Sequence, residues 1–143
     1  MNYKTILVPI DGSKASKIAL EEAIKIAKEN SASVIILHVV PQNADLIEVY
    51  KISSLKSAFQ QEGKKLLEEA YKYASQKGIS AISHLVEGKP WEEIIKIATT
   101  QNCDLIVMGS HGHSTFSKFF LGSVTQRVLG EAPCPVMVVR EKK

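Results

Sequence analysis

Short apolar runs alternate along this chain with stretches of helical periodicity, and that alternation constrains the fold more than any other feature. Each run is rich in valine, isoleucine and leucine and is too short for a helix, so each is expected to form a strand. The five runs are Thr5 to Ile10, Val34 to Val40, Ala81 to Val86, Leu105 to Met108 and Val136 to Val139. Strands that alternate with helices form a parallel sheet with helices on both faces, and strands covered on both faces are almost continuously apolar. The sequence therefore predicts a doubly wound α/β fold.

The connecting stretches carry start and stop signals for four helices. Ser13 is placed to cap the first helix, and Pro90 to be the first residue of the third. Glycine is expected to close the second helix at Gly78 and the fourth at Gly130. The expected helical stripes are Ile18 to Ala27, Phe59 to Ala74, Trp91 to Thr100 and a last one that begins at Gly122 and Ser123. Pro41 is expected to stop the second strand, and residues 42–54 and 87–90 are expected to be loops.

Size and composition narrow the class of protein. With 143 residues, 45% hydrophobic and 23% charged, the chain is expected to form one globular domain over residues 1–143. Its lysines are spread along the helices, so the net charge of +3 favours a solvated surface over a nucleic-acid interface. No apolar run approaches the roughly 20 residues of a membrane span, and no signal peptide is recognised. The two cysteines, Cys103 and Cys134, lack metal-type spacing and are expected to be reduced thiols of a cytoplasmic protein.

Residues 104–130 combine a buried strand, a glycine-bearing loop and the start of a helix. The glycines Gly109, Gly112 and Gly122, with Ser123, have the spacing G-x2-G-x9-G-S. Glycine lets backbone approach a ligand closely, and free N–H groups at a helix N-terminus attract anions. The stretch is therefore interpreted as a phosphate cradle. It contains neither a Walker loop nor the closer-spaced dinucleotide fingerprint. The alternative is structural, because Ser123 and Gln126 fit a capping box and each glycine alone fits a turn.

Residues at the ends of the first two strands could share that site. Asp11 is either a turn-forming residue before Gly12 or a carboxylate for a ribose hydroxyl or a metal held on phosphates. Pro9 is unusual in a central strand, because it removes a donor from the hydrogen-bond ladder, and it could frame a base. Val39 is expected in the core, where it could also line an apolar slot for a flat ring.

The histidines and cysteines suggest no catalytic or metal centre. His111 and His113 lack further ligands at zinc spacing, so solvent exposure and phosphate contact remain equal alternatives for both. His38 and His84 lie within strands and are expected to be structural. No nucleophile elbow, cysteine–histidine pair or paired carboxylates at strand ends are found, so no catalytic residue is assigned.

Several motifs together resemble the universal stress protein family, in its ATP-binding subgroup. The resemblance runs nearly end to end and includes the complete G-x2-G-x9-G-S signature. The matching segments are residues 6–13 (ILVPIDGS), 37–40 (LHVV), 87–90 (EGKP), 104–112 (DLIVMGSHG), 121–124 (LGSV) and 133–140 (PCPVMVVR). The resemblance implies an adenine nucleotide alpha hydrolase-like fold with strand order 3-2-1-4-5, which brings the first and fourth strands together.

The same resemblance implies ATP as the ligand, with Mg²⁺ or Mn²⁺ on its phosphates. Adenine would lie near Pro9, Val39 and Met108, and ribose near Asp11 and Gly109. Phosphates would lie on Gly112, His113, Gly122, Ser123 and Val124, with His111 as a further contact. Relatives often carry arginine or lysine where this chain has the two loop histidines, which implies a weaker or pH-dependent grip.

The resemblance also implies a homodimer formed by antiparallel pairing of the last strands, Val136, Met137, Val138 and Val139. Such pairing would cover an apolar edge strand. The favoured function is an ATP-binding regulatory protein of the stress response with at most weak ATP hydrolysis. The alternatives are an ATPase or nucleotidyl-transfer enzyme of related fold, and an interaction protein that binds no nucleotide.

Overall fold

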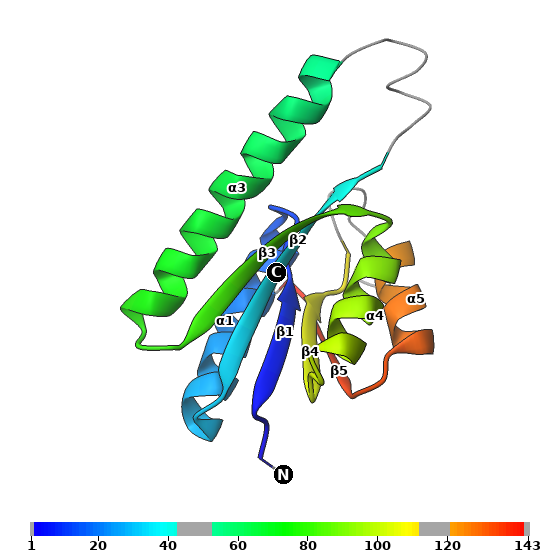
Figure 1. Ribbon diagram of the computed structural model, residues 1–143. Coiled ribbons are helices and arrows are strands. Elements are labelled where there is room, and N and C mark those ends of the chain that lie inside the picture. Colours follow the sequence, from blue (N-terminus) through cyan, green and yellow to red (C-terminus); the bar gives the residue numbers. More distant parts are fainter. Residues whose placement is uncertain (1, 43–52, 112–120, 142–143) are drawn as a thin grey trace.

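The five strands form one parallel sheet in the order β3-β2-β1-β4-β5, which confirms the expected doubly wound fold (Figure 1). The computed structural model describes residues 2–42, 53–111 and 121–141. The strands are β1 (Thr5–Pro9), β2 (Ser33–Pro41), β3 (Ala81–Gly88), β4 (Leu105–Gly109) and β5 (Val136–Val139). The helices are α1 (Lys14–Asn30), α3 (Ser53–Gln76), α4 (Pro90–Thr100) and α5 (Ser123–Glu131). None of the described helices is long and apolar enough to cross a bilayer.

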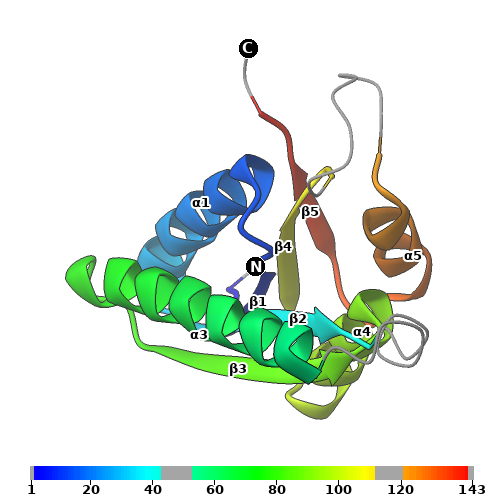
Figure 2. The same cartoon turned by 90° about the horizontal axis from the view of Figure 1, so that it is seen from above.

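The helices cover both faces of the sheet, α1 and α3 on one and α4 and α5 on the other (Figure 2). Successive strand side chains point to opposite faces. In β1, Ile6 and Val8 enter the core under α1 and α3, and Leu7 enters the core under α4 and α5. All three are fully buried. Burial on both sides explains why the strand residues are apolar without alternation.

The sheet opens between β1 and β4 at its carboxyl end. The β1–β2 pairing reaches Pro9 opposite Leu37, whereas the β1–β4 pairing ends at Leu7 opposite Ile106. The Thr5 carbonyl accepts from the Asp104 N–H, so alternate residues of β1, including Pro9, direct their ladder groups towards β4. Proline has no N–H to donate there. The connection after β1 leads to β2 on one side of it, whereas β4 lies on its other side, so the order of the strands reverses at β1. The pairing between β1 and β4 ends at this point, which is where doubly wound folds bind ligands.

Two expected strand boundaries are wrong, and both errors lie where β2 meets β3. Pro41 does not stop β2 but is its last residue, opposite Gly88, so Glu87 and Gly88 belong to β3 and not to a loop. Val34 donates to the carbonyl of Ser80, just before β3, and Gln42 donates to the carbonyl of Gly88 at the end of β3. Because the backbone groups of successive strand residues point to opposite sides, those of Pro41 face the β1 side. There β1 has already ended, and the missing donor of Pro41 interrupts no pairing.

Helix ends also differ from expectation in two places. Ser53 and Ser54 are the first residues of α3 and not part of a loop, while residues 43–52 lie outside the described part of the chain. Gly130 lies inside α5, which ends one residue later. Ala132 is extended, because the following proline disfavours helical backbone before it. Gly78 closes α3 with a φ of 76°, and Pro90 begins α4, both as expected.

Alanine is expected to destabilise the fold at Gly63 and to stabilise it at Gly130, although both glycines lie within helices. A Cβ at Gly63 would lie 2.6 Å from His38 Cδ2 and 2.8 Å from Leu85 Cδ1, whereas a Cβ at Gly130 has no neighbour within 4 Å. Overpacking lowers the free energy of unfolding by about 1–3 kcal/mol, whereas replacing glycine by alanine, a better helix former, raises it by about 1 kcal/mol. Urea unfolding should therefore show a net loss of about 1 kcal/mol for Gly63→Ala and a gain of about 0.5–1 kcal/mol for Gly130→Ala. Equal stabilisation by both would contradict the close approach of α3 to the sheet.

Candidate functional site

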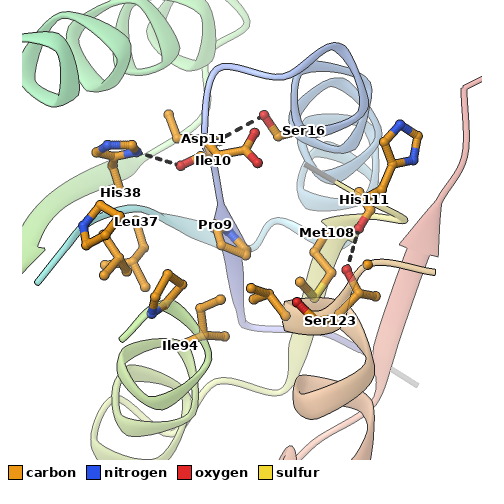
Figure 3. A pocket seen from close by; sticks show the side chains of 17 residues that line it. Pro9, Ile10, Asp11, Ser16, Leu37, His38, Ile94, Met108, His111 and Ser123 are labelled. Atoms are coloured by element: carbon orange, nitrogen blue, oxygen red, sulfur yellow. Dashed lines mark hydrogen bonds between the residues drawn. The ribbon is translucent and has the colours of Figure 1, made fainter. Parts of the chain in front are cut away.

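A cleft of about 270 Å³ lies at the carboxyl ends of β1, β2 and β4 and is bordered by the N-termini of α4 and α5 (Figure 3). Its volume is close to the lower end of the range for small-molecule sites. The described residues brought together there include most of those singled out from the sequence, namely Pro9, Asp11, Val39, Met108, Gly109, His111, Gly122, Ser123 and Val124. Gly112 and His113 lie outside the described residues.

One side of the cleft is apolar. Val39 on β2 and Met108 on β4 are 8% and 5% exposed, and Pro9 ends β1, the strand that lies between those two in the sheet. The sequence interpretation missed five further apolar lining residues, Ile10, Leu37, Pro41, Pro90 and Ile94. Pro90 could have been found from topology, because α4 begins directly after β3 at the same edge of the sheet. Ile94 follows it by one helical turn. The apolar side can therefore hold a flat, weakly polar group.

Asp11 organises the turn into α1. Its Oδ1 accepts from the Ser13 N–H at 2.8 Å, and its own N–H donates to the Ser16 Oγ at 3.3 Å. Ser13 caps α1 by accepting from the Ser16 N–H, as expected. Gly12 has a φ of 84°, which suits glycine in this turn. The turn-forming interpretation of Asp11 is thus correct, and Asp11 also places a carboxylate at the cleft.

Gly109 allows α1 to approach the end of β4. A Cβ there would lie 2.8 Å from the Ala15 Cβ and 2.9 Å from the Ala15 backbone carbon. The space that a side chain would fill is therefore occupied by α1 and not by the cleft. Gly109 can contribute backbone to the site, and its conformation is fixed by packing against a helix of the fold.

The start of α5 forms the opposite side of the cleft. Gly122 is the N-cap, and its N–H donates to the Ser110 carbonyl at 2.7 Å. A Cβ on Gly122 would lie 3.2 Å from the His111 Cα, so glycine permits this close contact between the loop ends. Ser123 and Val124 follow in the first turn, where helix N–H groups have no partner within the helix. The arrangement presents a helix N-terminus to the cleft, which suits an anion.

The capping box that was the structural alternative for Ser123 is not formed. Ser123 is the first helical residue and is exposed, and the N-cap Gly122 has no side chain with which to cap. Gln126 instead donates from its Nε2 to the Leu121 carbonyl at 2.6 Å. Because the serine hydroxyl is not used to cap the helix, the structural explanation for Ser123 is weakened.

Thr125 is a buried polar residue that the sequence interpretation missed. Its Oγ1 donates to the Gly109 carbonyl at 3.0 Å, and its side chain is 3% exposed. The bond fixes the first turn of α5 to the end of β4. The sequence did contain a signal for this role. Thr125 lies three residues before Val128, so it is on the inward face of the predicted helix.

The two histidines at the cleft differ in their partners. His111 contacts the Ser110 Oγ through Nδ1 at 3.1 Å and lies 3.8 Å, from Nε2, from the Glu141 carboxylate that follows β5. His38, expected to be structural, donates from Nδ1 to the Ile10 carbonyl at 2.8 Å when that nitrogen carries the proton. His38 therefore connects β2 to the turn that carries Asp11 while its ring also lines the cleft.

Other candidate groups lie away from the cleft. Burial raises the pKa of Cys103 to about 11, with smaller contributions from Cys134 and Asp104, and burial likewise raises the pKa of Cys134. Both thiols are free, and at neutral pH both are protonated and hence poor nucleophiles. Among the described residues there is no group of three or more histidine, cysteine, aspartate or glutamate side chains that could hold a metal ion.

The fold places the chain in a recognised class. A parallel sheet of order 3-2-1-4-5 with helices on both faces is the adenine nucleotide alpha hydrolase-like fold, and solved structures similar to this chain are universal stress proteins of that fold. Residues 2–140 match the sequence profile of the universal stress protein family. The chain therefore belongs to the universal stress protein family, which confirms the resemblance of its motifs.

Individual relatives agree with this assignment. Universal stress protein MJ0531 of Methanocaldococcus jannaschii is 36% identical over 143 residues, spanning 99% of this chain and 84% of the relative. The solved structure of MJ0577, from the same organism, has a TM-score of 0.88 and 35% identity and covers 100% of this chain and 99% of its own. A universal stress protein solved in complex with cAMP has a TM-score of 0.70 and 28% identity, and the match covers 98% of each chain.

Proposed function

We propose that this universal stress protein binds ATP in the cleft and acts as a nucleotide-dependent regulatory protein in the stress response. One observation carries the proposal. A single cleft at the opening between β1 and β4 has an apolar side next to a helix N-terminus. A nucleotide has matching parts, a flat base at one end and anionic phosphates at the other. The complex of a related protein with cAMP supports an adenine nucleotide as the class of ligand.

In the proposed complex, each side of the cleft contacts one part of the nucleotide. Adenine packs against Pro9, Val39 and Met108, and the ribose lies by Asp11 and the backbone of Gly109. The phosphates lie on the first turn of α5, at Gly122, Ser123 and Val124. His111, and the residues Gly112 and His113 outside the described structure, complete the phosphate contacts. The space filled by Ala15 supports a role for Gly109 through its backbone alone.

The proposed divalent ion, Mg²⁺ or Mn²⁺, is held mainly by the phosphates. Sites of this kind use one or two carboxylates together with the phosphates of the ligand. Asp11 fits that requirement, because it places one carboxylate at the cleft. The ion would neutralise phosphate charge, and Asp11 would orient it.

We propose a regulatory role because neither the sequence motifs nor the described cleft supplies a positioned general base for efficient hydrolysis. We further propose that residues 1–143 form one domain, that the protein is a cytoplasmic homodimer paired through β5, and that nucleic acids and membranes are not its partners. An ATPase or nucleotidyl transferase would instead turn over at about 1–10³ per second, the range typical of enzymes.

Identification of the bound nucleotide tests this function directly. The purified protein is denatured, any released nucleotide is separated by chromatography, and the emptied protein is titrated calorimetrically with ATP in the presence of Mg²⁺ or Mn²⁺. Titrations with AMP, cAMP and GTP serve as matched controls. Release or tight binding of ATP without rapid turnover is the expected result. Tighter binding of cAMP than of ATP would make cAMP the proposed ligand. Absence of binding by any adenine nucleotide would favour the alternative function, an interaction protein that binds no nucleotide.

A further inference from the structure

Helices α4 and α5 are joined by a stacked pair of side chains. The guanidinium carbon of Arg127 lies 3.9 Å from the centre of the Trp91 ring. That distance is well within the roughly 6 Å limit for a cation–π interaction, and tryptophan is the aromatic residue that binds cations best. Arg127 also pairs with Glu131, one turn later on α5, at 3.1 Å between Nη2 and Oε2. The glutamate thus helps to hold the guanidinium over the ring.

The two partners of this pair lie directly behind opposite sides of the cleft. Trp91 follows Pro90, which lines the apolar side. Arg127 lies one helical turn after Ser123, on the helix whose N-terminus lines the other side. The two helices lie next to each other on the same face of the sheet in both views (Figures 1 and 2). The stack therefore couples the apolar side of the cleft to the helix N-terminus.

The orientation of α5 depends on few contacts. The helix has nine residues, of which only Thr125 and Val128 are buried. Its N-terminus is fixed to β4 and the following loop by the bonds of Thr125 to Gly109 and of Gly122 to Ser110. Those bonds hold the N-terminal end of the helix, and the fully buried Val128 packs its second half into the core against the sheet. A contact to α4 acts beside these two anchors on the tilt of the helix. The Trp91–Arg127 pair supplies a lateral contact to α4 at that point.

We infer that Trp91 and Arg127 are positioning residues that fix the N-terminus of α5 relative to the apolar side of the cleft. Neither touches the ligand in the proposed complex. Their effect is to hold the first-turn N–H groups where phosphates must lie once the base is seated. Small misplacements of binding groups weaken interactions strongly. The pair consequently controls how well the site binds the phosphates, and this role rests on the proposed nucleotide-binding function.

The role of the pair is tested by measuring the affinities of the Trp91→Leu variant for ATP and for adenosine, which lacks the phosphates. This substitution changes no charge. We expect the ATP affinity to fall about two- to fivefold, the fold-change that corresponds to loss of an exposed cation–π contact, while the adenosine affinity stays unchanged. Trp91→Phe keeps an aromatic face and should restore most of the ATP affinity. Equal losses for ATP and adenosine would show a merely structural role and overturn the inference, as would an unchanged ATP affinity.

Variants of Arg127 separate stacking from charge. Arg127→Lys keeps the positive charge and can keep a weaker cation–π contact, but it loses the planar stack, so it should weaken ATP binding less than Arg127→Met does. Coupling with Trp91→Leu in a double-mutant cycle should be clear, because both changes remove the same contact. Leu129→Ala, on an exposed part of α5, is the matched control and should leave both affinities unchanged. Additive effects of the two substitutions would contradict a shared action.

Amide hydrogen exchange in the protein without ligand gives a readout independent of nucleotide binding. In Trp91→Leu and Arg127→Met the amides of α5 should exchange faster than in the parent protein, while those of α1 remain protected. If the parent protein binds no adenine nucleotide, the proposed function fails, yet faster exchange would still establish that the pair orients α5. Unchanged exchange in α5 would overturn the inference whatever the ligand.

Discussion

Gly122→Val is expected to abolish ATP binding while the protein stays folded. A Cβ at this position would lie 3.2 Å from the His111 Cα and 3.5 Å from the Ser110 carbonyl oxygen. The two γ carbons of valine would add bulk where the phosphate is proposed to meet the first turn of α5. Charge-assisted hydrogen bonds contribute about 1.5–3 kcal/mol each, so the loss of one would reduce affinity about ten- to hundredfold and the loss of two about a hundredfold or more.

The backbone dihedral angles of Gly122, a φ of −60° and a ψ of 153°, are available to any residue, so valine needs no unusual backbone conformation at the N-cap. The cost of the substitution comes from the close contact of its Cβ with the His111 backbone. Calorimetric titration with ATP and a divalent ion measures the affinity, and circular dichroism during heating measures the fold. Gly130→Ala on the same helix is the control. Wild-type affinity in Gly122→Val would show that the glycine is only part of a turn.

Val138→Glu is expected to convert the proposed dimer into monomers. Strand β5 is an edge of the sheet, and its Met137 side chain is 37% exposed. In an antiparallel pairing of two β5 strands, the substitution would place two carboxylates close to one another in an apolar contact. Burying unpaired charge costs several kcal/mol, enough to weaken dimerisation about a hundredfold or more.

The opposite edge of the sheet supplies a matched control for this experiment. Ile82 lies on β3 and is 52% exposed, so Ile82→Glu also places a carboxylate on an apolar edge strand. Analytical ultracentrifugation over a range of concentrations should show dimers for the wild type and for Ile82→Glu, and monomers for Val138→Glu. Dissociation by Ile82→Glu instead would move the interface to β3, and a monomeric wild type would remove the dimer from the proposal.

The fold class followed from physical patterns in the sequence, whereas the strand order followed only from the family resemblance. Alternating apolar runs and helical stripes specify parallel strands, but they contain no information on which strands are neighbours. Without that order, Asp11 and Gly109 could not be placed at one cleft by sequence reasoning alone. The comparison with solved structures and the strand pairing now confirm the order.

The errors in the sequence interpretation have a common physical cause, which is that tertiary contacts override local signals. Pro41 looked like a strand terminator, yet its missing donor faces a side without a partner. Ser123 and Gln126 matched a capping box, but a glycine took the N-cap position. Thr125 was not singled out from the sequence, because its hydrogen bond to the end of β4 joins it to a residue sixteen positions away.

Pro9 has a consequence for the energetics of occupancy. Because Pro9 has no N–H to donate towards β4, the gap between β1 and β4 is present without a ligand. A ligand that enters this gap breaks no backbone hydrogen bond. Binding there requires no separation of strands, so little of the interaction energy is lost to reorganisation. An alanine at that position would restore the N–H and leave it facing an empty cleft. The proline thus keeps the sheet open for a ligand. It also avoids an unsatisfied backbone N–H in the ligand-free protein.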